Sequence, residues 1–505
     1  MPEALAKLKE QLTLIGGLIY ANALMGWDQE SQMPEGGAAP RARAMASVSH
    51  VAHEMSTSAE YARLLEAAEA EADRLGLDPD SDDARLLWWA RRDFARDTRL
   101  PAPFVAELTE KTSVANQVWQ AARRDDDYER FAPHLAEIIR LQRQLAEYMG
   151  YEAHPYDALL DLYEPDLTTA EVRRIFDDLR ERTVPLVRAI AERQDAVDSS
   201  PLYQFFPEER QWALARETTA RFGYDYNRGR MDRSAHPFCM GLATDDVRIT
   251  LRAEENFFNA CFFAALHECG HALYEQGLPT HFQWTPLGAA ASSAFHESQS
   301  RLWENIVGRS RAFWRGYYAR VQAVFPQQLG NVEMEAFYRA INRAEPSPIR
   351  VEADEVTYNL HVMLRFDLEV AMMEETITVR DLPKRWNEKM EQYLGIVPES
   401  DAAGVLQDTH WAIGLYGYFP TYTLGNVLSV QLYEAATETH PDIPQQIEQG
   451  NTAPLLGWMR EHIHAQGRKY LPQELLLRAA HRPLDAGPYV RYLEEKYSDI
   501  YGLAS

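Results

Sequence analysis

The chain has 505 residues, of which 46% are hydrophobic and 25% are charged, and its formal net charge is −25. This composition is ordinary for a globular protein that is long enough to bury a large core. The acidic surface disfavours nucleic acid and anionic membranes as partners, and no uninterrupted apolar run reaches the length of a membrane span.

The first residues and the cysteines both favour a cytoplasmic protein. The apolar stretch at residues 12–25 is interrupted by Asn22, and an acidic segment follows where a small-residue cleavage site would be expected. We therefore expect no signal peptide. The three cysteines, Cys239, Cys261 and Cys269, are too few for a disulfide framework. This number fits a reducing compartment.

Most of the chain is predicted to be amphipathic helix, because apolar residues recur at spacings of three and four. The clearest segments are residues 41–74, 104–120, 131–148 and 169–195. Thr168 and Glu171 have the spacing of a capping box, which would start the last of these helices.

Strand signals are few, and the clearest is the alternating, β-branched segment at residues 247–252. We expect it to be an edge strand. It either pairs with an extended peptide beside a catalytic site or is an ordinary edge strand of the same geometry.

The next segment, from His267 to His271, has the sequence H-E-C-G-H. On a helix, positions i and i+4 share a face, so the two imidazoles can bind one divalent ion. Glu268 can then take a proton from a water on that ion. The motif therefore predicts a metallohydrolase, most often a peptidase.

The context of the motif supports a metal. A strongly apolar run at residues 257–266 precedes it, and Gly277 is expected to end the helix as a C-cap. Polar side chains on such a buried helix are costly unless they are satisfied, and a metal would satisfy them. Cys269 points to the opposite face, and we interpret Cys269 and Gly270 as packing residues.

A catalytic zinc needs three protein ligands and one open position. The segment from His296 to Glu304 begins another helical pattern, and His296 and Glu297 are both candidates for the third ligand. Because two histidines and one carboxylate are the familiar peptidase set, we favour Glu297.

Several separated motifs give the chain a resemblance to the M32 family of metallocarboxypeptidases, the thermostable carboxypeptidase type. The motifs are HPF at 236–238, DxRxT at 246–250, HExxH at 267–271, HES(Q) at 296–299, IRxxAD at 349–354 and GxxQDxHW at 404–411. Segments 27–30 and 156–161 are also similar to the family. Many metallopeptidases share HExxH alone, but six motifs in this order are highly specific.

The resemblance implies a mainly α fold. It would be one large helical domain over residues 1–505, similar in architecture to neurolysin and angiotensin-converting enzyme, with a long substrate groove and a small β-sheet beside the metal site. Residues 1–200 would cover the groove, and residues 201–505 would carry the metal site. The family also pairs as homodimers.

By matched position, the resemblance makes His267, His271 and Glu297 the metal ligands and Glu268 the catalytic base. It implies one zinc ion per subunit, and cobalt would be able to substitute.

A carboxypeptidase must also bind a free C-terminal carboxylate, and the planar fork of arginine suits this task. Arg350, in a matched motif, is the first candidate, and Arg248 is the second. The alternatives are structural ion pairs, of Arg350 with a neighbouring carboxylate such as Asp354 and of Arg248 with Asp246.

Oxyanion donors are expected from the late segment, because related helical peptidases use a histidine and a tyrosine from such a region. The candidates are His410, Tyr418 and Tyr422, although a tyrosine there can equally belong to the core. We expect His236 to shape the groove. His361 is either a substrate-side donor or a buried structural histidine.

These expectations define the leading hypothesis: a cytoplasmic zinc carboxypeptidase that removes C-terminal residues one at a time from peptides with a free C-terminus. One alternative is an oligoendopeptidase or a dipeptidyl carboxypeptidase on the same scaffold. Another is a non-catalytic peptide-binding protein that keeps the groove.

Overall fold

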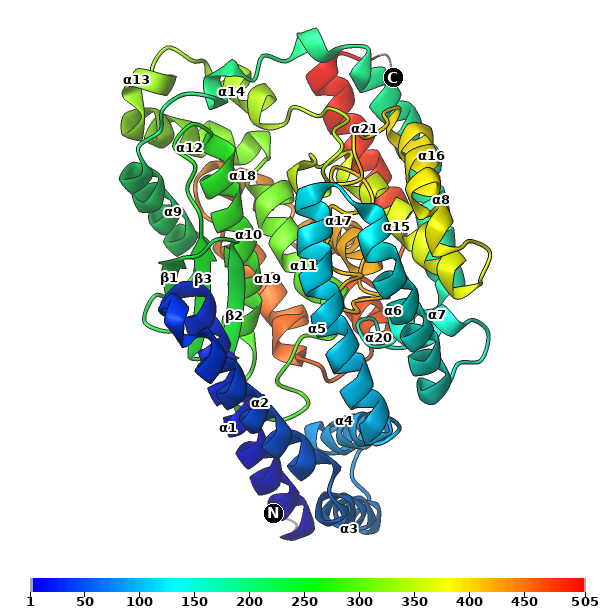
Figure 1. The fold of residues 1–505 in the computed structure, drawn as a ribbon. Helices are drawn as coiled ribbons and strands as arrows, with labels where there is room; N and C mark the ends of the chain where they lie inside the picture. The colour runs from blue at the N-terminus through cyan, green and yellow to red at the C-terminus, as the bar shows by residue number, and fades with distance from the viewer. Residues whose placement is uncertain (1–2, 504–505) are drawn as a thin grey trace. The chain divides into compact units, whose positions relative to one another are not determined.

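The computed structural model describes residues 3–503 of the chain. This part of the chain is mainly helical and has one three-stranded sheet (Figure 1). The expectation of a mainly α fold with a small sheet is confirmed. Within the same residues, none of the helices combines the length and the hydropathy that crossing a membrane requires.

The chain divides into two compact units, and each unit collects separate segments of the sequence. Unit 1 comprises Met1–Thr98, Ser200–Met334 and Leu432–Pro483, and unit 2 comprises Arg99–Ser199, Glu335–Gln431 and Leu484–Ser505. The description of the whole chain as one domain stays a prediction. The expected division into residues 1–200 and 201–505 also stays a prediction.

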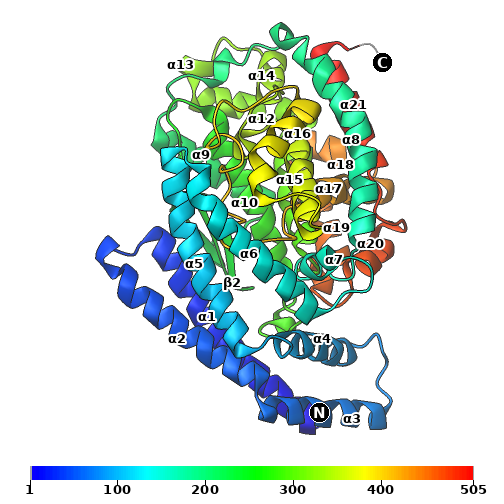
Figure 2. The same cartoon turned by 45° about the vertical axis from the view of Figure 1, so that its right-hand side comes forward.

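The helices of unit 1 are α1 (Glu3–Ser31), α2 (Ala38–Thr57), α3 (Ala59–Leu75), α4 (Asp82–Asp97), α9 (Glu208–Phe222), α10 (Phe258–Gly277), α11 (Ser293–Arg301), α12 (Arg311–Val324), α13 (Pro326–Leu329), α18 (Ile443–Glu448), α19 (Ala453–His462) and α20 (Pro472–Ala480). Helices α1 and α2 lie side by side (Figures 1 and 2). Apolar residues of α1 at helical spacing, Leu5, Leu8, Leu12 and Ile15, join a buried cluster with residues of α3 and α4.

The predicted helix at residues 41–74 is in fact two helices, because the helical conformation is interrupted at Ser58. Ser58 has extended backbone angles, and its Oγ accepts a hydrogen bond from Tyr61 N at 3.0 Å as the N-cap of α3. A serine side chain can compete for backbone groups in this way. The apolar spacing alone did not reveal this interruption, because it continues from one helix into the next.

The sheet consists of β1 (Gly229–Arg233), β2 (Phe238–Ala243) and β3 (Asp246–Leu251) in the order β1-β3-β2. Strand β3 pairs parallel with β1 and antiparallel with β2. The expectation that the segment at 247–252 is an edge strand is therefore wrong. Because β3 is paired on both sides, a peptide cannot add to it, and the edges of the sheet are β1 and β2.

Helix α10 carries the H-E-C-G-H motif, and its predicted end at Gly277 is confirmed. The reason differs from the expected C-cap. Gly277 is still helical, and a Cβ there would lie 2.4 Å from Nδ1 of His464, so close packing requires the glycine. Cys269 is fully buried, and its Sγ lies 3.8 Å from Thr219 O on α9, as expected for a packing residue.

The helices of unit 2 are α5 (Ala102–Asp125), α6 (Tyr128–Met149), α7 (Pro155–Leu160), α8 (Thr169–Ala191), α14 (Met334–Ile341), α15 (Tyr358–Met373), α16 (Leu382–Leu394), α21 (Gly487–Tyr501) and the first part of α17 (Pro420–Thr439). The predicted helices at 104–120, 131–148 and 169–195 correspond to α5, α6 and α8. The capping box of α8 is confirmed, since Glu171 N donates to Thr168 Oγ1 and Thr168 N donates to the Glu171 carboxylate.

A buried carboxyl group fastens α15 to the loop that precedes α17. Glu369 has no exposed surface and accepts hydrogen bonds from Trp411 Nε1 at 2.8 Å, Gly417 N at 3.1 Å and the Tyr156 hydroxyl at 2.7 Å. Burial raises the pKa of Glu369 to about 7, although these hydrogen bonds act in the opposite direction.

This raised pKa predicts a pH-dependent contribution to stability. The folded state binds the Glu369 proton more tightly than the unfolded state does, so the contribution is fully present below the ordinary pKa of 4.5. This contribution is lost as the pH rises through about 7. The free energy of unfolding then falls by at most about 1.4 kcal/mol per pH unit.

Glu369→Gln keeps a neutral side chain at every pH, so it isolates this effect. We expect the thermal midpoint of the wild type to fall relative to that of the variant between about pH 5 and about pH 8. Calorimetry of both proteins across this range measures the difference. A difference that does not change with pH would contradict the assignment.

Candidate metal centre

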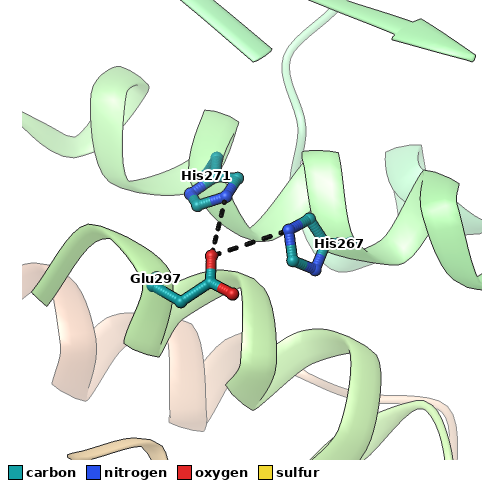
Figure 3. A group of neighbouring side chains, drawn as sticks. All are labelled: His267, His271 and Glu297. Atoms are coloured by element: carbon teal, nitrogen blue, oxygen red, sulfur yellow. Dashed lines mark ion pairs between the residues drawn. The ribbon is translucent and has the colours of Figure 1, made fainter. Parts of the chain in front are cut away.

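Three side chains converge on one point in unit 1. Glu297 Oε2, on α11, lies 3.7 Å from His267 Nε2 and 3.4 Å from His271 Nε2, both on α10 (Figure 3). The three ligand atoms all lie within 4.8 Å of one another. Within residues 3–503, this is the one group of histidine, cysteine and acidic side chains with the spacing of a metal site.

The other candidate for the third ligand, His296, lies outside this group. Its Nε2 faces Glu275 Oε1 at 2.9 Å, and its ring stacks on the ring of His271 with the centroids 4.4 Å apart. The choice of Glu297 over His296 therefore agrees with the geometry.

A close approach of two helices brings the three side chains together. A Cβ at Gly270 would lie 2.4 Å from Gln299 O and 2.6 Å from Ser300 Cα, so only glycine allows α10 and α11 to pack at this distance. The interpretation of Gly270 as a packing residue is confirmed, and the structure adds what it packs against. Because Gly270 lies beside His271 and Gln299 follows Glu297 closely, this contact sets the separation of the ligands.

The protonation states of two of the three side chains, Glu297 and His271, suit a divalent cation. Burial acts to raise the pKa of Glu297, but Arg301 and the two histidines hold it well below its usual range. The Arg301 Nε–H donates to Glu297 Oε1 at 2.7 Å. Burial and the neighbouring imidazole of His296 lower the pKa of His271 to about 3. Glu297 is thus ionised and His271 neutral at neutral pH, as metal ligands must be.

The remaining polar atoms also fit a bound cation. His271 directs Nε2 at Glu297, and its other ring nitrogen, Nδ1, is buried and has no hydrogen-bond partner among the described residues. Two imidazole nitrogens and one carboxylate oxygen form the donor set of a catalytic metal site with an open position. The three side chains can therefore hold one divalent metal ion.

Glu268 lies between the two histidines in sequence, and only 6% of its surface is exposed. Burial raises its pKa to about 7. A carboxyl group with a pKa near neutrality can both accept and return a proton, which is the property required of a general base.

The two other predicted residues of unit 1 lie in β3 and in the connection between β1 and β2. Arg248 binds Asp246 through two hydrogen bonds of 2.8 and 2.9 Å, and its guanidinium lies 4.3 Å from the ring centre of Trp27. The expected structural pair of Arg248 with Asp246 is thus present. His236 is exposed in the connection between β1 and β2.

In unit 2, Arg350 is buried and forms an ion pair with a carboxylate other than Asp354. Its Nε and Nη2 donate to Asp408 Oδ1 at 3.0 and 2.7 Å, and its Nη1 donates to the Tyr358 hydroxyl at 3.0 Å. The alternative of a structural ion pair is therefore present, but its partner is Asp408 and not Asp354. Asp354 instead accepts hydrogen bonds from the backbone and side chain of Thr357, at the start of α15.

Asp408 also binds a second guanidinium. Arg365 Nε donates to Asp408 Oδ2 at 2.6 Å, and Arg365 has no exposed surface. Burial acts to raise the pKa of Asp408, but the two arginines hold it well below its usual range. Two cations therefore share one carboxylate, and the excess positive charge favours the binding of an anion. The sequence prediction omitted Asp408 and Arg365, although Asp408 lies in the GxxQDxHW motif.

The other predicted residues of unit 2 gather beside this pair. His410 Nε2 lies 3.3 Å from the Tyr422 hydroxyl, and the rings of Tyr418 and Tyr422 meet edge to face at 5.3 Å. Burial lowers the pKa of His410 to about 4, so its imidazole is neutral. His361 is fully buried, and the hydrogen bond that it accepts from Arg365 Nη1 is to its backbone carbonyl, so both roles considered for its side chain stay predictions.

A helical protein in which H-E-x-x-H on one helix meets a carboxylate from another belongs, by its site, to the class of metallopeptidases. Comparison with known proteins defines the family. The chain matches the carboxypeptidase Taq (M32) metallopeptidase family over residues 7–497, and it belongs to this family. It is 41% identical to thermostable carboxypeptidase 1 of Thermus thermophilus over 96% of both chains, and 36% identical to carboxypeptidase 1 of Bacillus subtilis over 95% of both.

Solved structures agree with this assignment. The crystal structure of M32 carboxypeptidase from Deinococcus radiodurans R1 has a TM-score of 0.96 and 40% identity, over 99% of this chain and 100% of that chain. The structure of Pyrococcus furiosus carboxypeptidase has a TM-score of 0.94 and 38% identity, over 98% of this chain and 99% of that one. The protein is therefore an enzyme of the metallocarboxypeptidase class, and the endopeptidase and non-catalytic alternatives are not favoured.

The close approach at Gly270 can be tested with Gly270→Ala. The added methyl group has to separate α10 from α11, so we expect overpacking to destabilise the protein by about 1–3 kcal/mol. Metal affinity, measured by competition with a chelator, should fall as well, because Glu297 moves away from the histidines. Gly457→Ala, in α19, is the control, since a Cβ there meets no atom within 4 Å. Equal metal affinity in both variants would contradict the role of Gly270.

Proposed function

We propose that His267, His271 and Glu297 hold one zinc ion per chain, and that this centre cleaves the last peptide bond of peptides with a free C-terminus. The observation that carries the proposal is the convergence of the three ligand atoms within 4.8 Å. The donor set matches that of zinc peptidases with one open position. Cobalt accepts the same donors, and we propose that it can substitute for zinc.

The chemistry is divided between the cation and the chain's own residues. A divalent metal at this site supplies Lewis acidity, which polarises the scissile carbonyl and makes a water ligand more acidic. Glu268 accepts a proton from the attacking water and passes it to the leaving amine. We assign His410, Tyr418 and Tyr422 as candidate hydrogen-bond donors to the developing oxyanion. The 3.3 Å contact of His410 with Tyr422 supports their acting together.

Arg350 is assigned to the carboxylate of the substrate's last residue. Asp408 and Tyr358 use three of its five N–H groups, which leaves two for a further acceptor. Arg248 is a weaker candidate, because its Nε and Nη2 already donate to the two carboxylate oxygens of Asp246. We propose that the exposed His236 shapes the groove and that His361 is a substrate-side donor, with a buried structural histidine as the alternative.

The remaining assignments concern the enzyme's surroundings. The three cysteines are free thiols, which supports the proposed cytoplasmic location. The pairing of two chains as a homodimer, the substrate groove, and the architectural similarity to neurolysin and angiotensin-converting enzyme remain predictions from the resemblance.

Replacement of Glu268 by glutamine tests the general base. Glu268→Gln keeps the shape of the side chain but cannot accept the proton, so we expect kcat to fall by a factor of about 10²–10⁴. Zinc content, measured by elemental analysis, should stay near one ion per chain. A variant that retains turnover within a few-fold of the wild type would exclude Glu268 as the base.

Replacement of Arg350 tests the recognition of the C-terminal carboxylate. Each hydrogen bond to a charged group contributes about 1.5–3 kcal/mol, so Arg350→Ala should lower kcat/KM for free C-termini by at least about 100-fold. Arg350→Lys, which keeps the charge next to Asp408, should show a smaller loss.

Arg182→Ala is the matched control in unit 2, because Arg182 forms only an exposed ion pair with Glu494. Amidated peptides should be poor substrates of the wild type and of all the variants. The readout is the mass of the products from peptides with free and blocked ends. Comparable cleavage of both kinds by the wild type would refute carboxylate recognition.

A further inference from the structure

The helix that supplies Glu297 changes its winding at Leu302, five positions after that residue. Residues Leu302–Val307 form a π-helical segment, η5, in which Gly308 N donates to Trp303 O at 3.0 Å. Such wider turns are rare and often occur at functional sites. They rotate the following side chains relative to those of the preceding α-helix. In this case the rotated residue is Glu304.

Glu304 reaches back to the metal centre from this turn. Its Oε2 lies 2.9 Å from Nδ1 of His267, the ring nitrogen that faces away from Glu297. No role for Glu304 followed from the sequence motifs, because it lies seven positions after Glu297, with Arg301 at the helical spacing between them.

The charges around Glu304 determine which partner carries the proton. Arg301 Nη1 lies 3.3 Å from Glu304 Oε2, and Arg309 Nη2 lies 3.5 Å from Oε1, so two guanidinium groups stabilise the ionised carboxylate. An ionised carboxylate only accepts hydrogen bonds. The proton in the short contact therefore belongs to His267 Nδ1, which leaves Nε2 as the ring nitrogen that can bind a cation.

We propose that Glu304 is a positioning residue of the metal centre. It fixes the ring orientation and the tautomer of His267, so that Nε2 is presented to the cation next to Glu297. The inference rests on the proposed metal centre. It concerns only one of the two histidines, since His271 Nδ1 has no carboxylate partner among residues 3–503 and its ring stacks on His296 instead.

Tight packing holds the π-helical turn against α10. A Cβ at Gly308, directly after η5, would lie 2.4 Å from Cδ1 of Leu266, the residue before His267. The segment after η5 therefore packs closely against α10, next to the histidine that Glu304 contacts. Arg301 joins this arrangement to the ligand, because its Nε donates to Glu297 Oε1 at 2.7 Å.

The test measures metal affinity rather than activity. Metal-free wild type, Glu304→Gln and Glu304→Ala are titrated with Co²⁺ in competition with a chelator, and the visible spectrum of bound Co²⁺ is recorded. Loss of such a carboxylate typically weakens metal binding about 10- to 100-fold, and we expect the larger loss for alanine. The spectrum should change in both variants, because the ring of His267 is free to turn.

Glu217→Gln is the matched control, since Glu217 pairs with Arg320 in the same unit at 2.6 Å. We expect it to keep the wild-type affinity and spectrum. The thermal midpoints of the metal-free proteins separate a loss of fold from a loss of positioning. If Glu304→Ala does not fold, Glu304→Gln, which is nearly isosteric, carries the test.

Two failures can be distinguished. Wild-type affinity and an unchanged Co²⁺ spectrum in Glu304→Gln and Glu304→Ala would overturn the role of Glu304 and leave the metal centre intact. If the wild type binds no Co²⁺, or if His267→Ala binds it as tightly as the wild type, the metal centre itself is wrong, and the role of Glu304 fails with it.

Discussion

The distance between α10 and α11 is the constraint on which the metal centre depends. A carboxylate from one helix has to reach two imidazoles on the other, and this requires backbones closer than ordinary side chains permit. Gly270 provides that space against the backbone of Gln299 and Ser300. Because protein interiors are close-packed, such contacts leave little freedom for the ligands to move. The site is therefore organised before substrate arrives.

Buried charges form the second layer of this organisation. An unpaired carboxylate in a buried position is costly, and in unit 1 Arg301 contacts both Glu297 and Glu304. In unit 2, the buried Asp408 is held between Arg350 and Arg365. The two groups differ in what they still attract. The group in unit 1 directs lone pairs of its ligand atoms at one point, which suits a cation. The group in unit 2 has an excess of positive charge, which suits a carboxylate.

Much of the site could be predicted from the sequence because its signals are local. The i, i+4 spacing of His267 and His271 places both on one helical face wherever the helix lies. The capping box at Thr168 and the helices α5, α6 and α8 followed from equally local patterns. Matched motifs supplied the family and the expectation of a small sheet. Local patterns failed at Ser58, where a side-chain cap interrupts a continuous apolar spacing.

Only the tertiary structure decided which groups these residues and segments contact. Arg350 binds Asp408 instead of Asp354, which is nearer in the sequence. Strand β3 is central because two strands with weak signals lie on either side of it. Glu304 reaches His267 through a change of helical winding. The physical reason is common to all three. Periodicity fixes which face of an element a residue occupies, whereas its contacts depend on which distant segment packs against that face.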